Sequence, residues 1–141
     1  MLFRSNPETN FYKGVPSNYK PKVHYHQAWV SSNPNEPDPA KPFIPRVIAK
    51  TAKPEDYVFF KLDIDALGIE TNMVEHYLSE EGSNHLAYLD EFAWEHHIRG
   101  NYIMARRGWC PGTCDRTKSL KDSYEYFLKL RQKGVRAHSW V

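Results

Sequence analysis

YVFFKLDID, residues 57–65, is the stretch of this sequence that decides the fold. Its first residues are almost continuously apolar and favour β structure, which is typical of a strand buried on both faces of a parallel sheet. Asp63 and Asp65 alternate at its end, so both side chains point to one face if the strand runs straight to its tip. We therefore expect a central strand whose carboxyl end carries two carboxylates.

Helix and strand patterns alternate around this strand. We expect strands over residues 23–30, 86–96 and 135–141, and helices over 45–53, 69–78 and 120–133. Such alternation predicts an α/β fold with a mainly parallel sheet and helices on its faces. Ligands of such sheets bind beyond the carboxyl ends of the strands, where the polar side chains of this sequence gather.

The clearest helix pattern follows Ser119, a residue type suited to the N-cap, and stops at Gly134, which suits the C-cap. We expect its apolar stripe to consist of Leu120, Tyr124, Phe127 and Leu128. We also expect a set of aromatic side chains in the core: Phe92, Trp94, Tyr124, Phe127 and Trp140.

The chain is long enough for one compact domain, with 141 residues of which 40% are hydrophobic. Residues 1–22 are polar and rich in turn-forming residues, so we expect an extended N-terminal arm before a domain over residues 23–141. Residues 31–42, SSNPNEPDPAKP, are too rich in proline for anything but a loop.

Charge and hydropathy exclude two classes of protein. The 19 Lys and Arg residues are interspersed with 17 Asp and Glu residues and the net charge is +2, so the sequence shows no basic cluster of the kind that binds nucleic acid. No stretch approaches the ~20 apolar residues of a membrane helix, and the N-terminus lacks the apolar core of a signal peptide. We expect a soluble intracellular protein, in the cytoplasm or in an organelle interior.

The two cysteines, Cys110 and Cys114, flank a Pro-Gly pair in WCPGTC. Three interpretations are open: two free thiols in a reducing compartment, a small-loop disulfide, and half of a zinc site. We favour them in that order, because a structural zinc site of this kind needs a second pair of ligands.

Several segments in order resemble the end of class I, S-adenosylmethionine-dependent methyltransferases of the FkbM type. They are DYVFFKLDID, a following helix that opens with IE, LAYLDEFAWEHH and SLKDSYEYFLKLRQKGVRAHSW. The resemblance covers about residues 54–141. It implies a partial Rossmann-like methyltransferase sheet in which residues 57–65 form the family's fourth strand and 86–97 its fifth. Residues 23–32, VHYHQAWVSS, correspond to its third strand.

The sequence departs from this family in two places. The family's Asp-x-Glu-Gly tip is here Asp65-Ala66-Leu67-Gly68, so the second acid is an aspartate and the glycine is displaced. The family's first strand and glycine-rich turn have no counterpart, since Gly14 is the sole glycine before residue 23. The resemblance is therefore to the carboxyl-terminal half. It implies S-adenosylmethionine as cofactor, and we expect none to be bound by this chain alone.

The candidate site residues lie at the expected strand ends. The resemblance implies that Asp63 and Asp65 contact cofactor or substrate, directly or through a divalent cation, for which carboxylate oxygens are suitable. The alternative is that they simply end a strand and cap the next helix. Because adjacent strand residues face opposite ways, His97 and not His96 should share a face with Glu95, where it could act as a general base.

Two hypotheses on function follow. The first is a methyltransferase-derived domain that lacks the cofactor-binding half and is a non-catalytic subunit or interaction component of a larger assembly. The alternative is an S-adenosylmethionine-dependent O-methyltransferase acting on a small or sugar-like acceptor, with Asp63, Asp65 and His97 as its catalytic residues.

The family's first strand would lie beside residues 57–65. We expect that open edge to be covered by another protein chain, by a second copy, or by residues 23–30.

Overall fold

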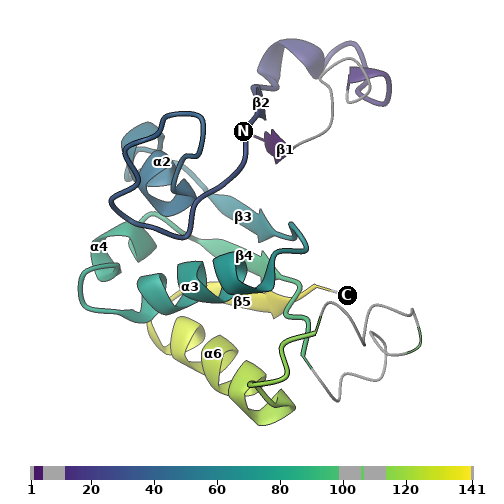
Figure 1. Ribbon diagram of the computed structural model, residues 1–141. Helices are drawn as coiled ribbons and strands as arrows, with labels where there is room; N and C mark the ends of the chain where they lie inside the picture. Colours follow the sequence, from purple (N-terminus) through teal and green to yellow (C-terminus); the bar gives the residue numbers. More distant parts are fainter. Residues whose placement is uncertain (1, 5–11, 99–105, 107–113, 141) are drawn as a thin grey trace. The chain divides into compact units, whose positions relative to one another are not determined.

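The computed structural model describes residues 2–4, 12–98, 106 and 114–140 (Figure 1). The chain forms two compact units, Met1–Ile44 and Pro45–Val141. None of the helices in the described ranges is long and apolar enough to cross a membrane.

The first unit contains a small parallel sheet. β1 (Leu2–Arg4) pairs with β2 (Tyr25–Gln27), and the 3-10 helix η1 (Lys20–Lys22) precedes β2. The strand expected over residues 23–30 is therefore shorter than predicted, and it pairs with β1 and not with β3 of the second unit. Residues 25–27 are thus in a different sheet from residues 59–62, and the alternative in which residues 23–30 fill the edge beside residues 57–65 is not found among the strand pairings of the described residues.

The second unit is built on a three-stranded, all-parallel sheet, so the expected α/β class is confirmed. In chain order its elements are α2 (Ile44–Thr51), β3 (Phe59–Leu62), α3 (Leu67–Leu78), α4 (Ser83–Leu86), β4 (Glu91–Trp94), α6 (Leu120–Gln132) and β5 (Arg136–Ser139). The strand order is β3-β4-β5, and Figure 1 shows the three arrows pointing the same way.

The central strand of this sheet is β4 and not β3. Phe92, Ala93 and Trp94 are all buried, whereas Phe59 in β3 is 50% exposed. The prediction of a central strand over residues 57–65, buried on both faces, is therefore wrong. In this unit β3 has a strand neighbour on one side, β4, and its burial alternates along the strand. An apolar run alone does not distinguish a central strand from an edge strand.

Helices α3 and α6 pack on the sheet face that carries Phe92 and Trp94 (Figure 1). The ring of Tyr77 in α3 lies 6.2 Å from that of Phe92, and the ring of Phe127 in α6 lies 5.9 Å from that of Trp94. The opposite face of the strands carries polar side chains together with those of Phe59 and Ala93. There His138 Nε2 lies 3.1 Å from a carboxylate oxygen of Glu91.

Helix α6 begins as predicted but presents a different face to the core. Ser119 forms a capping box with Asp122, and Gly134 follows the helix with a φ of 96°. The buried residues of α6 are Ser123, Phe127 and Leu130, whereas four residues predicted to be apolar contacts are exposed: Leu120, Tyr124, Leu128 and, after β5, Trp140. Phe127, which packs on Trp94, is the one member of the predicted stripe that is buried, and it shares the core-facing side of the helix with Ser123 and Leu130.

The strand expected over residues 86–96 starts later than predicted. Its first residue, Leu86, ends helix α4, and β4 begins at Glu91. The intervening Asp90 carboxylate accepts a hydrogen bond of 2.8 Å from the amide of Val58. This contact ties the start of β3 to the start of β4 and thereby aligns the opposite ends of the two strands, where the candidate site lies.

Candidate functional site

The structure brings the predicted acids and His97 together at the carboxyl ends of β3 and β4. His97 Nε2 lies 3.2 Å from Glu95 Oε2 and 3.5 Å from Asp65 Oδ1. The parallel pairing continues past the strands, since the amide of Glu95 donates to the carbonyl of Leu62 at 3.2 Å. Side chains that alternate onto one face beyond the end of β3 therefore lie beside those that alternate onto the same face beyond the end of β4.

This edge cluster, which we define as Asp65, Glu95 and His97, is buried on the β4 side and open on the β3 side. Glu95 is 6% exposed and His97 is 2% exposed, whereas 71% of the Asp65 side chain is exposed. One ligand atom from each of the three lies within 4.8 Å of the others. An ionisable cluster of this kind at the carboxyl edge of a parallel sheet lies where ligands of α/β proteins bind.

Asp63 adds a carboxyl–carboxylate hydrogen bond to the edge cluster. Burial raises the pKa of Glu95, and its hydrogen bond with Asp63 raises that pKa further. Burial also acts to raise the pKa of Asp63, but the hydrogen bond with Glu95 and the ammonium of Lys61 outweigh it and lower that pKa. Glu95 is therefore the member of this pair that more readily holds a proton, and Asp63 remains ionised beside Lys61.

Glu70 fixes the tip that carries Asp65. Its carboxylate is 2% exposed and accepts hydrogen bonds from the amides of Ile64 (2.9 Å) and Ala66 (3.5 Å) and from Trp94 Nε1 (2.9 Å). Burial raises the pKa of Glu70, and these donors oppose the rise. The contacts bracket Asp65, whose φ of 55° lies in the left-handed region.

Sequence reasoning missed Glu70 as a site residue. The available signal was a glutamate in the first turn of a helix that follows a strand tip, and such residues are usually exposed and favoured there by the helix dipole. Its burial under Trp94 comes from the packing of α3 on the sheet, which no local pattern specifies.

His96 faces away from the edge cluster, as period-two alternation predicted. Its ring stacks on Trp94 with centroids 3.9 Å apart, and its Nδ1 lies 3.1 Å from the hydroxyl of Ser123. Burial lowers the pKa of His96 from 6.5 to about 4, so the imidazole is neutral near pH 7. His96 is a packing residue between β4 and α6.

Cys114 is disulfide-bonded, so the prediction of a free thiol is wrong for this residue and the disulfide interpretation holds. Cys110 lies outside the described residues. The amide of Asp115, the next residue, donates a hydrogen bond of 2.6 Å to the carbonyl of His97. The segment after Cys114 therefore fixes the backbone of the edge cluster, and a disulfide sulfur at Cys114 is no thiolate ligand for zinc.

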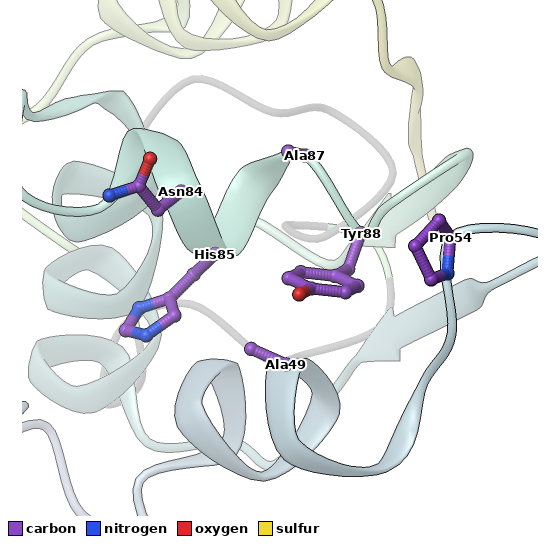
Figure 2. Close-up of a pocket in the computed structure, with 6 residues that line it drawn as sticks. All are labelled: Ala49, Pro54, Asn84, His85, Ala87 and Tyr88. Carbon is purple, nitrogen blue, oxygen red and sulfur yellow. The ribbon is translucent and has the colours of Figure 1, made fainter.

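A separate surface pocket lies between α2 and α4 (Figure 2). It is lined by Ala49, Pro54, Asn84, His85, Ala87 and Tyr88. The His85 ring that lines it lies 2.8 Å, Nδ1 to Nε2, from the ring of His76. None of the predicted site residues lines this pocket, and its lining offers no carboxylate, so the chemistry expected from the sequence belongs to the sheet edge.

Comparisons with family models, with curated proteins and with solved structures find no match to this chain. Its function is therefore argued from the sheet edge. There, a buried imidazole lies between two carboxyl groups, an arrangement that can orient a base for proton transfer or hold a cation.

Proposed function

We propose that this chain is a methyltransferase-derived α/β domain that lacks the cofactor-binding half and works as a component of a larger assembly. In the family that the sequence resembles, the fourth strand lies between the first and the fifth. The parallel pairing of β3 with β4 supports assigning these two as the fourth and fifth strands. The other side of β3 is the place of the first strand.

The observation that carries this proposal is the open edge of β3. The carbonyls of Val58 and Leu62 accept hydrogen bonds from the β4 side, at 3.1 and 3.2 Å. Peptide groups alternate in direction along a strand, so the amides of Phe59 and Lys61 point away from β4. Within this unit the sheet has no strand beyond β3 among the described residues. An apolar edge of this kind is a template for pairing with another chain.

The side chains of β3 support the same proposal. Phe59 is 50% exposed, although burying a phenylalanine fully stabilises a protein by about 1.5 to 3 kcal/mol. A second copy of the chain or a different protein that added a strand to β3 would cover backbone groups and the Phe59 ring together. We propose such a chain as the partner.

The edge cluster favours a second candidate function, O-methyl transfer to a small or sugar-like acceptor. Burying Glu95 and His97 costs free energy that a purely structural domain could avoid with apolar residues. In this candidate, Asp63 and Asp65 line the acceptor site and His97 takes the proton of the acceptor hydroxyl. The glycine-rich half that binds S-adenosylmethionine would come from another chain.

Titration calorimetry with S-adenosylmethionine, combined with light scattering, tests the proposal. We expect no binding to the 141-residue chain, and an apparent mass above that of one chain. The missing glycine-rich turn is the reason, because glycine lets the backbone approach such a ligand closely. A micromolar dissociation constant would overturn the non-catalytic assignment and support the second candidate. Asp65→Asn should then weaken binding, whereas Glu80→Gln, two residues beyond the end of α3, should not.

A further inference from the structure

We infer that Asp65, Glu95 and His97 form a binding site for a divalent transition-metal cation such as Mn²⁺. The inference concerns the same sheet edge as the proposed function but does not require methyl transfer. A chain that never binds S-adenosylmethionine could still bind the cation.

The spacing of the ligand atoms fits a shared cation. Two ligand atoms that each lie about 2.1 Å from one metal ion are about 3.0 Å apart at a right angle and about 3.4 Å apart at the tetrahedral angle. His97 Nε2 lies 3.2 Å from Glu95 Oε2 and 3.5 Å from Asp65 Oδ1. Two of the three separations already match, and the third needs at most a small rotation of the exposed Asp65 side chain, since all three atoms lie within 4.8 Å of one another.

The burial of two of the ligands is a separate argument. Glu95 and His97 are at least nine-tenths buried, and charged groups in such positions are usually paired or coordinate metals. Their backbone is fixed, because the amide of Glu95 donates to Leu62 and the carbonyl of His97 accepts from Asp115. A cation would therefore bind to two ligands that need little rearrangement, and Asp65 would close over it from the solvent side.

The outer contacts resemble those that orient metal ligands. Glu70 accepts from the two amides that bracket Asp65 and from the indole of Trp94. Partners of this kind hold ligands in place, and their loss typically weakens metal binding about 10- to 100-fold. The cluster thus has both a set of candidate ligands and a surrounding set of hydrogen bonds.

The ligand types narrow the choice of cation. Imidazole suits Zn²⁺, Fe²⁺ and related ions, whereas carboxylates suit Mg²⁺, Ca²⁺ and Mn²⁺. One imidazole with two carboxylates favours an ion that accepts both, and Mn²⁺ is such an ion. Three protein ligands also leave coordination positions open towards solvent beside Asp65, where an oxygen-bearing ligand could bind.

The same contacts have a competing explanation, in which a protonated His97 simply forms ion pairs with the two carboxyl groups. Adding Mn²⁺ to the 141-residue chain separates the two. We expect the electron paramagnetic resonance signal of free Mn²⁺ to fall until one ion is bound per chain. We also expect the bound ion to broaden the amide resonances of Asp65, Glu95 and His97 before those of Glu80, which follows the C-terminal end of α3, and Arg136, which begins β5 beside the start of β4.

A matched pair of variants completes the test. Asp65→Asn removes an exposed ligand and should weaken Mn²⁺ binding about tenfold or more, without loss of fold. Glu80→Gln removes one exposed carboxylate elsewhere and should leave the affinity unchanged. An undiminished free Mn²⁺ signal, broadening that avoids the three amides, or equal affinity in both variants would each overturn the inference. S-adenosylmethionine binding is measured separately, so failure of either proposal is visible without the other.

Discussion

Replacing Glu70 by glutamine tests how the tip that carries Asp65 is held. The hydrogen-bond partners of the Glu70 carboxylate are all donors: two backbone amides on one oxygen and the Trp94 indole on the other. Glutamine has nearly the same shape but offers one oxygen and one NH₂ group. Whichever way its amide is turned, a donor faces a donor inside the protein.

The expected cost follows from those contacts. Glu70→Gln loses at least one hydrogen bond to a charged group, worth about 1.5 to 3 kcal/mol, and leaves a buried donor unsatisfied, which costs about 1 to 3 kcal/mol. Because the tip can relax and admit water beside the exposed Asp65, we take the lower part of the summed range. We expect the free energy of unfolding to fall by about 3 kcal/mol, roughly a hundredfold in the equilibrium constant.

Urea unfolding followed by tryptophan fluorescence measures this change, at one fixed protein concentration for all variants. Glu80→Gln, an exposed substitution of the same kind, is the control and should change the free energy of unfolding by less than about 0.5 kcal/mol. A Glu70→Gln protein as stable as this control would show that Glu70 does not hold the tip. The reasoning about Asp65 would then fail with it.

Three further predictions concern packing and capping. Burial lowers the pKa of His96 from 6.5 to about 4, so the stability that depends on neutral His96 is present above pH 6.5 and is lost as the pH falls towards 4. The loss should approach about 3 kcal/mol by urea unfolding, and His96→Gln should flatten this pH dependence. A Cβ at Gly82 would lie 1.7 Å from the carbonyl oxygen of His76, whereas a Cβ at Gly68 meets nothing within 4 Å. Thermal melts should therefore show Gly82→Ala destabilised by about 2 kcal/mol or more, and Gly68→Ala unchanged or stabilised by up to about 1 kcal/mol. Ser119→Ala removes the cap of α6 and should cost about 1 kcal/mol in urea unfolding, and an unchanged value would contradict the role of the capping box.

Much of the site could be predicted from local pattern. Period-two alternation placed His97 beside Glu95 and turned His96 away, and the expected parallel sheet brought Asp65 to the same edge. These predictions depend on strand geometry, which varies little between proteins. The cap at Ser119 is also a local feature, and it was predicted for the same reason.

The predictions that failed depend on long-range packing. Helix α6 carries apolar residues on more than one side, so their spacing alone does not define which side faces the core. In the structure Phe127 contacts Trp94 and is buried, whereas Tyr124 is exposed. The apolar run of β3 likewise does not reveal that, among the described residues of its sheet, the strand has a neighbour on one side only. The burial of Glu70 depends on how α3 lies against β4, and that arrangement leaves no mark in the adjacent sequence.

Amide hydrogen exchange in β3 tests most directly whether this domain is completed by another chain. The backbone amides of Phe60 and Leu62 point towards β4, whereas those of Phe59 and Lys61 point away from it. At a dilution where light scattering gives the mass of one chain, we predict slow exchange at Phe60 and Leu62 and fast exchange at Phe59 and Lys61. Equally slow exchange at all four amides in the monomer would show that the chain covers its own edge, and would contradict the proposal of a partner.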